Sequence, residues 1–87
     1  MQQAIDINAI SKELCQFISA NILAEGVVLD NETILGNIGV DSFSIIEIIL
    51  FIERKYGVVI PDESLLPENL KSVSALARCT FNYLQPH

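Results

Sequence analysis

The sequence is short of basic residues. Five Lys and Arg stand against eleven Asp and Glu, which gives a formal net charge of −6 at pH 7. The imbalance is strongest over residues 25–68, where nine acidic residues accompany only Arg54 and Lys55. Such a charge distribution repels nucleic acid and anionic membrane surfaces and attracts proteins with a basic patch. We therefore expect protein partners, with no nucleic acid and no membrane among them.

Cysteine and histidine are also scarce. The two cysteines, Cys15 and Cys79, lie in segments with helical periodicity, and the single histidine is His87. Neither cysteine has the CxxC or His-rich surroundings typical of metal sites, so we expect no metal and two partly buried free thiols in a reducing compartment. The sequence also lacks a Ser-His-Asp or Cys-His set and a Gly-rich phosphate loop. We therefore predict no catalytic residues and no enzyme activity.

Long apolar runs are missing as well. The longest apolar segment, residues 45–52, is interrupted by Glu47 and is too short to cross a bilayer. The first ten residues, MQQAIDINAI, contain no basic residue and no long apolar stretch, so they do not form a secretory signal. These features predict a cytoplasmic protein without a membrane span.

The residues that are present indicate one helical domain over residues 1–87. About half of them are hydrophobic, which is enough for one small core in a chain of this length. Asp41 and Ser72 are typical N-cap residues, and Gly57 stands where a left-handed C-cap is expected. Apolar residues recur at spacings of three and four over three segments, which we predict to be helices: 6–23, 42–56 and 72–84.

The connecting segments differ in character. Residues 24–41 show no period and contain three glycines, so we predict a long functional loop held down by its apolar side chains. Residues 58–61 should be extended, and residues 62–66 should form a short helical turn that ends before Pro67. The predicted fold class is all-α: a small four-helix bundle with three main helices, a short third helix and a long loop between the first two main helices.

The helix predicted over residues 42–56 is apolar on two sides. One stripe is wide enough to be its core face: Ile45, Ile48, Ile49, Ile52 and Tyr56. A second stripe of Phe43, Ile46 and Leu50 is bordered by Glu47, Glu53 and Arg54. This stripe either packs on the long loop or the short third helix, or forms a recognition surface in which apolar contacts are framed by acids.

Ser42 is the first residue of this helix and directly follows the predicted cap, Asp41. Free backbone N–H groups and the positive end of the helix dipole lie at this position, and both favour an attached or bound phosphate. A serine at a helix start is ordinarily capping chemistry. The position therefore permits a phosphate group without requiring one.

The order of motifs around Ser42 resembles the acyl carrier protein family of the stand-alone type. The carrying segments are Ile-Gly-Val-Asp-Ser-Phe at 38–43, Glu-Ile-Ile at 47–49 and Tyr-Gly-Val-Val-Ile-Pro-Asp-Glu at 56–63. Lys-Ser-Val at 71–73 matches the family's entry to its last helix, so the resemblance covers roughly residues 30–84. Asp-Ser-Phe alone is a weak signal, whereas the ordered set at family spacing is a strong one.

This resemblance implies a role for individual residues. Ser42 matches the serine that accepts 4'-phosphopantetheine from coenzyme A, and Asp41 matches the acid recognised by the phosphopantetheinyl transferase. The arm would hold an acyl intermediate as a thioester for partner enzymes of fatty acid, polyketide or related specialised biosynthesis. Such partners would be acyl-transferring, condensing or ligating enzymes with basic docking patches, and the carrier would be a monomer. The contacts expected on this chain are Phe43, Ile46, Glu47, Leu50 and Glu53.

Some residues depart from the family pattern. Phe43 replaces the usual Leu, Ser44 stands where an acid is frequent, and Arg54 and Lys55 make the end of this helix less negative. These departures favour a specialised pathway, such as polyketide, aryl-polyene or modified fatty acid synthesis, over housekeeping fatty acid synthesis. An alternative is an aminoacyl, D-alanyl or peptidyl carrier with the same arm, although residues 38–41 lack the usual peptidyl carrier motif. A remote alternative is an unmodified helical interaction domain.

Overall fold

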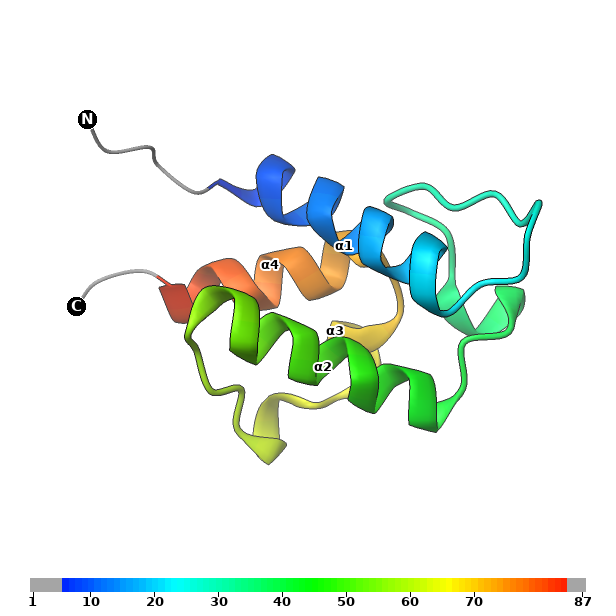
Figure 1. Ribbon diagram of the computed structural model, residues 1–87. Helices are drawn as coiled ribbons and strands as arrows, with labels where there is room; N and C mark the ends of the chain where they lie inside the picture. The colour runs from blue at the N-terminus through cyan, green and yellow to red at the C-terminus, as the bar shows by residue number, and fades with distance from the viewer. Residues whose placement is uncertain (1–5, 85–87) are drawn as a thin grey trace.

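The computed structural model describes residues 6–84, which form an all-helical bundle without a strand in that range (Figure 1). The predicted fold class is therefore confirmed. No helix among the described residues is long and apolar enough to cross a membrane. The elements, in chain order, are α1 (Ile7–Asn21), the 3₁₀ helix η1 (Leu35–Ile38), α2 (Ser42–Tyr56), the 3₁₀ helix η2 (Asp62–Ser64), α3 (Pro67–Leu70) and α4 (Val73–Leu84).

Side-chain caps set the starts of the long helices. The Asp6 carboxylate accepts a hydrogen bond from the Ala9 amide at 2.8 Å, and the buried Ser72 hydroxyl accepts one from the Ala75 amide at 3.2 Å. Each bond satisfies an amide that the helix itself leaves without a partner. Helix α2 ends at Gly57, whose φ of 67° is the left-handed conformation in which glycine carries no Cβ penalty.

Two short helical elements follow α2, where the sequence predicts one. The predicted short helical turn before Pro67 is present as η2, a 3₁₀ turn over residues 62–64. The α-helical turn α3, which begins at Pro67, was not predicted. Proline fits the first helical residue, because its φ is already near the helical value and its missing N–H has no partner to lose there.

The segment between α1 and α2 is anchored rather than free. The buried Leu35 in η1 donates its amide to the Lys71 carbonyl at 2.8 Å, and the Ser74 amide donates to the Asn31 carbonyl at 2.9 Å. The Cys15 thiol contacts the Asn31 side chain at 3.4 Å. These bonds attach the segment to α1 and to the start of α4, as the prediction of a pinned loop requires; η1 itself was not predicted.

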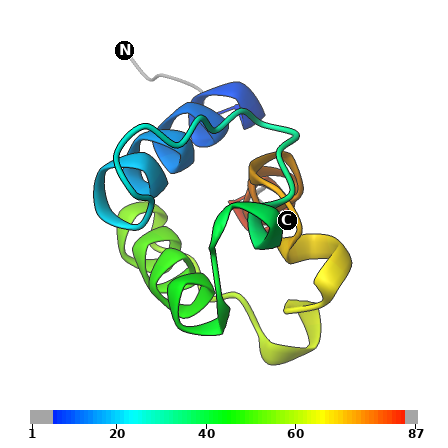
Figure 2. The ribbon, with the colours of Figure 1, turned by 90° about the vertical axis from the view of Figure 1, so that its right-hand side faces the viewer.

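The three long helices surround one core. Figure 2 shows their arrangement after the view of Figure 1 is turned by 90°. Helix α1 packs mainly against α4, and α2 closes the bundle on the remaining side. Among the large, fully buried side chains of residues 6–84, Thr80 is the polar one, and it donates its hydroxyl to the Leu76 carbonyl at 2.8 Å. Among the described residues, those buried to about 1% exposure or less are Ile10, Leu14, Ile18, Leu35, Ile48, Ile52, Val73, Leu76, Ala77 and Thr80.

Candidate functional site

Ser42 is the exposed first residue of α2. The side chain of the preceding Asp41 caps the helix by accepting a hydrogen bond from the Ser44 amide at 2.9 Å, and the Asp41 carbonyl accepts one from the Ile45 amide at 3.0 Å. The amides of the first turn that remain lack intrahelical partners and lie at the positive end of the helix dipole. The Ser42 hydroxyl is therefore presented to solvent where a phosphate is electrostatically favoured.

The residues before Ser42 hold it in place. Val40 is buried, and its amide donates to the Leu35 carbonyl at 3.2 Å. Gly39 ends η1 with a φ of 94°, a conformation that residues with a Cβ rarely adopt. The turn from η1 to α2 is therefore tied to the core at Leu35 and Val40, and this anchoring fixes the direction from which Ser42 enters the helix.

The fold lowers the pKa of the Asp41 carboxyl. The Ser44 amide, followed by the Ser44 side chain, donates hydrogen bonds that hold the pKa of the Asp41 carboxyl below its usual value. A negative charge at the start of α2 also interacts favourably with the helix dipole. Position 41 thus carries a charged carboxylate in the residue directly before Ser42.

Helix α2 exposes the second apolar stripe that its sequence contains. Phe43 is 80% exposed, Ile46 is 56% exposed and Leu50 is 46% exposed, and Glu47 is exposed on the same helix. The alternative in which this stripe packs on the loop or on the short third helix is therefore wrong. We call the exposed surface formed by Phe43, Ile46, Glu47 and Leu50 the docking face.

Glu53 differs from the other predicted contact residues. It is half-buried, and its carboxylate accepts a hydrogen bond from the Ile60 amide at 3.1 Å. This bond joins the last turn of α2 to the extended segment that follows, so Glu53 has a structural partner within the chain. Sequence reasoning missed the bond because the two residues are seven positions apart and are brought together only by the left-handed turn at Gly57.

A second feature of α2 lies at its contact with α1. The rings of Phe17 and Phe51 stack with centroids 4.2 Å apart and an interplanar angle of 15°. Beside them, the Lys55 ammonium pairs with the Glu13 carboxylate at 2.9 Å. Burial, reinforced by the Glu13 carboxylate, raises the pKa of Tyr56 to about 12. Phe51 belongs to neither apolar stripe of the predicted helix. The spacing of apolar residues in this helix therefore did not indicate its contact with Phe17.

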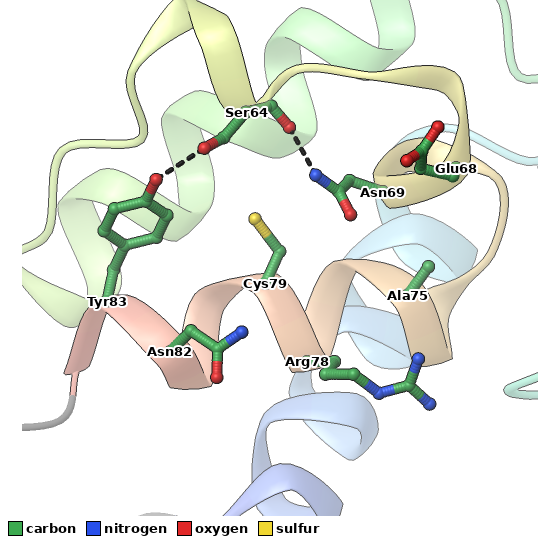
Figure 3. Close-up of a pocket in the computed structure, with 8 residues that line it drawn as sticks. All are labelled: Ser64, Glu68, Asn69, Ala75, Arg78, Cys79, Asn82 and Tyr83. Carbon is green, nitrogen blue, oxygen red and sulfur yellow. Dashed lines mark hydrogen bonds between the residues drawn. The ribbon is translucent and has the colours of Figure 1, made fainter.

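A hollow of about 200 Å³ lies between α4 and the segment that contains η2 and α3. Figure 3 shows the residues that line it. The Ser64 side chain hydrogen-bonds the Tyr83 hydroxyl and so joins η2 to α4. The Ser64 carbonyl accepts a hydrogen bond from the side-chain amide of Asn69 at 2.7 Å, which ties η2 to α3. The Cys79 side chain points from α4 towards this segment. None of the predicted site residues lines the hollow.

Both cysteines are half-buried free thiols, which confirms the expectation for their state. Burial raises the pKa of both the Cys15 and Cys79 thiols, and Asp30 adds to the rise at Cys15. Thiols in this state are poor nucleophiles and poor metal ligands. Within residues 6–84, no group of three His, Cys, Asp or Glu side chains is placed to hold a metal ion. His87, the single histidine of the sequence, lies outside the described residues.

A family model described as "Phosphopantetheine attachment site" matches residues 12–80. Among curated relatives, aminoacyl carrier protein 1 of Bradyrhizobium diazoefficiens is 29% identical over 79 residues, covering 91% of this chain and 86% of that protein. Aminoacyl carrier protein 2 of the same organism is 34% identical over 53 residues, covering 61% of this chain and 60% of that protein. The acyl carrier protein of Zymomonas mobilis is 42% identical over 38 residues, covering 44% of this chain and 49% of that protein.

Two solved structures agree with these relatives. Both contain Bradyrhizobium japonicum glycine:[carrier protein] ligase, one complexed with glycylated carrier protein and one with its cognate carrier protein and an analogue of glycyl adenylate. The matched chain of the first is 27% identical with a TM-score of 0.67, covering 84% of this chain and 96% of that one. The matched chain of the second is 26% identical with a TM-score of 0.70, covering 87% of this chain and 96% of that one. The chain therefore belongs to the phosphopantetheine-attachment family of non-catalytic carrier proteins, whose members bear 4'-phosphopantetheine covalently.

Proposed function

We propose that the chain is an aminoacyl carrier protein and that Ser42 is its attachment residue. The observation that carries the second part is the exposed Ser42 hydroxyl at the start of α2, next to the capping carboxylate of Asp41. The first part is supported by the likeness to aminoacyl carrier proteins and to the carrier chains found with a glycine ligase. These relatives favour the aminoacyl alternative over the fatty acid or polyketide role that the sequence first indicated.

The chain's own residues present and position the arm, and other enzymes perform the chemistry. The free amides of the first turn of α2 would face the phosphate on Ser42, and Asp41 would be read by the phosphopantetheinyl transferase. The terminal thiol of the attached group supplies a thioester link to the cargo.

The close packing of the core favours a small cargo on the arm over a long apolar one. The face of α2 that points inward is filled by Ile48 and Ile52, which lie in the same buried cluster as Leu76, and each is exposed by 1% or less. A long apolar chain could enter between the helices only by displacing these side chains, and disturbing a close-packed core costs stability. An amino acid on the arm requires no such displacement. The partial match to an acyl carrier protein keeps a fatty acyl cargo as the second candidate.

The partner that loads the arm would bind the docking face. Phe43, Ile46 and Leu50 supply apolar area, and Glu47 supplies a charge that steers a basic patch towards it. Glu53 contributes less to docking than the sequence suggests, because its carboxylate is engaged by Ile60. A contact of this kind is weak and sensitive to salt. The half-buried free thiols Cys15 and Cys79 suit a reducing compartment, so we propose a cytoplasmic location.

The attachment site is tested by intact mass after incubation with coenzyme A and a promiscuous phosphopantetheinyl transferase. We expect the mass of one phosphopantetheine to be gained by the parent and by Ser44→Ala, but not by Ser42→Ala. Ser44 is the matched control because it is the next serine on the same helical turn. A gain in Ser42→Ala, or none in a folded parent, would refute the assignment of Ser42.

The cargo is tested on the modified protein. It is incubated with a glycine:[carrier protein] ligase and a panel of amino acids, and in parallel with an enzyme that loads fatty acids onto carrier proteins. Loading with an amino acid at the higher kcat/KM supports the aminoacyl proposal. Preferential loading with a fatty acid would replace it by the second candidate.

A further inference from the structure

A groove runs along the contact between α1 and α2. Two adjoining hollows of about 320 Å³ and 270 Å³ share Phe17, Phe51 and Lys55 as lining residues. The stacked rings of Phe17 and Phe51 form the apolar part of this surface. Arg54 on α2 lines the first hollow, and Glu13 and Gln16 on α1 line the second. We call this surface the seam groove.

The two cations of the seam groove are not equivalent. Lys55 is paired with Glu13 at 2.9 Å, so its charge is largely compensated. Arg54 is exposed and forms no ion pair with any residue in the range 6–84. The helix dipole favours a cation in the last turn of α2, but it does not account for a guanidinium that borders an aromatic hollow. A planar guanidinium next to apolar surface is well suited to a bidentate carboxylate.

The seam groove is continuous with the docking face. Arg54 follows Leu50 by four residues and Glu47 by seven, so these three residues lie along one side of α2. At 1.5 Å per residue, Arg54 lies about 18 Å along α2 from Ser42. A partner that covers the docking face while it reaches the arm on Ser42 can therefore also contact the seam groove.

We propose that the seam groove binds an acidic segment of the enzyme that loads this carrier, with a carboxylate on Arg54 and an apolar side chain on the Phe17–Phe51 pair. This inference rests on the proposed function, because it gives the same partner a second contact. A basic segment would be repelled by Arg54, which forms no ion pair within residues 6–84. An extended polyanion would be repelled by a chain whose net charge is −6. A short acidic segment interacts mainly with charges close to it, Arg54 among them, because charges beyond about 10 Å are screened at 0.1 M salt.

Loading kinetics provide the first test. For the modified protein and the ligase that loads it, we expect Arg54→Glu to raise KM about tenfold, the effect of losing one well-formed charge pair, with kcat nearly unchanged. Lys71→Glu is the matched control, because it reverses an exposed cation at the junction of α3 and α4 and has the same net charge. Its KM should change by less than about twofold. Equal increases in the two variants would show a general charge effect and would overturn the proposal.

A binding measurement tests the groove without any loading reaction. The ¹⁵N-labelled protein is titrated with a helical peptide of Glu and Leu, and separately with a peptide of the same length made of Lys and Leu. We expect the acidic peptide to shift the amide signals of Phe17, Phe51 and Arg54, and Arg54→Glu to remove these shifts. Shifts at these residues that are equal for both peptides, or missing with the acidic one, would contradict the proposal.

The outcomes of these tests separate the groove from the proposed function. If no ligase loads the chain but the acidic peptide binds at Arg54, the aminoacyl role fails and the groove remains a site for acidic segments. If loading proceeds and Arg54→Glu has no effect on it, the aminoacyl role stands and the second contact fails. Sedimentation velocity tests whether a second copy of the chain occupies the groove. Self-association that Arg54→Glu abolishes would assign the groove to that second copy and overturn the partner proposal.

Discussion

The carboxylate of Glu53, in the last turn of α2, accepts a hydrogen bond from the backbone amide of Ile60 at 3.1 Å. Ile60 is itself buried in the core, and Gly57 makes the left-handed turn between the two residues. The bond therefore fixes where the chain re-enters the core after α2. It also explains why an acidic residue at this position of the helix is half-buried.

Replacing Glu53 tests whether this bond stabilises the fold. Glu53→Ala leaves the part-buried Ile60 amide without its partner, and we expect the free energy of unfolding to fall by about 1–2 kcal/mol. Glu53→Gln keeps an oxygen acceptor and should lose less than half as much. Urea unfolding followed by circular dichroism measures both variants. A similar loss in both would mean that the charge of Glu53, rather than its bond to Ile60, provides the stabilisation.

The Asp41 cap predicts a dependence of stability on acid. The pKa of this carboxyl is lower in the folded chain than its ordinary value of 3.8, so Asp41 stabilises the fold above that value. The stabilisation by ionised Asp41 is lost as the pH falls from 3.8 through the pKa of Asp41 in the folded chain. In this range the unfolded chain protonates Asp41 more readily than the folded chain does. We expect wild type to be more stable than Asp41→Ala at pH 7 and the difference to shrink below about pH 4.

Asp41→Asn separates the two roles of this residue. Asparagine caps helices about as well as aspartate but carries no charge. We therefore expect Asp41→Asn to retain most of the stability at neutral pH but to be modified more slowly by the transferase. Urea unfolding at several pH values and a time course of intact mass measure the two effects. Modification of Asp41→Asn at the wild-type rate would exclude the charge as a recognition feature.

The parts of the fold that follow from local rules were predictable. The caps at Asp41 and Ser72 and the turn at Gly57 depend on neighbouring residues, so the helix that starts at Ser42 was placed correctly. Pro67 was misjudged because proline both ends a helix and favours its first position, and the choice depends on where the following residues pack. For the same reason η1 was missed: Leu35 is held by the Lys71 carbonyl, which lies far along the chain.

The candidate site divides in the same way. Ser42 and Asp41 were recognised because their motif is contiguous, and the exposure of Phe43 follows from its position opposite the core stripe. The seam groove depends on Phe17 and Phe51, which belong to different helices, so no spacing within one helix reveals their stacking. Contacts between elements are set by packing. The helical period indicates which face of a helix is buried, but not which residues of another helix that face contacts.

Tyr56 predicts the behaviour of the fold at high pH. Its hydroxyl is enclosed and makes no hydrogen bond with residues 6–84, so Tyr56→Phe should leave stability at pH 7 unchanged or raise it by up to about 1 kcal/mol. The folded pKa of about 12 lies above the ordinary value of 10, so the protonated phenol stabilises the fold below pH 10, and this contribution is lost as the pH rises towards 12. We expect wild type to lose stability over that interval more steeply than Tyr56→Phe, as measured by urea unfolding. Parallel curves for the two proteins would contradict a raised pKa.

Phe43 is the sharpest test of the docking face. Its side chain is 80% exposed, so Phe43→Ala should change the free energy of unfolding by no more than about 0.5 kcal/mol. The same change removes the largest apolar contact offered beside Ser42, and we expect kcat/KM for loading by the partner ligase to fall about tenfold or more. Val59→Ala is the matched control, because Val59 is 78% exposed but lies on the extended segment after α2. Equal losses of loading in the two variants would show that exposed apolar area in general, rather than the face at Phe43, is what the partner recognises.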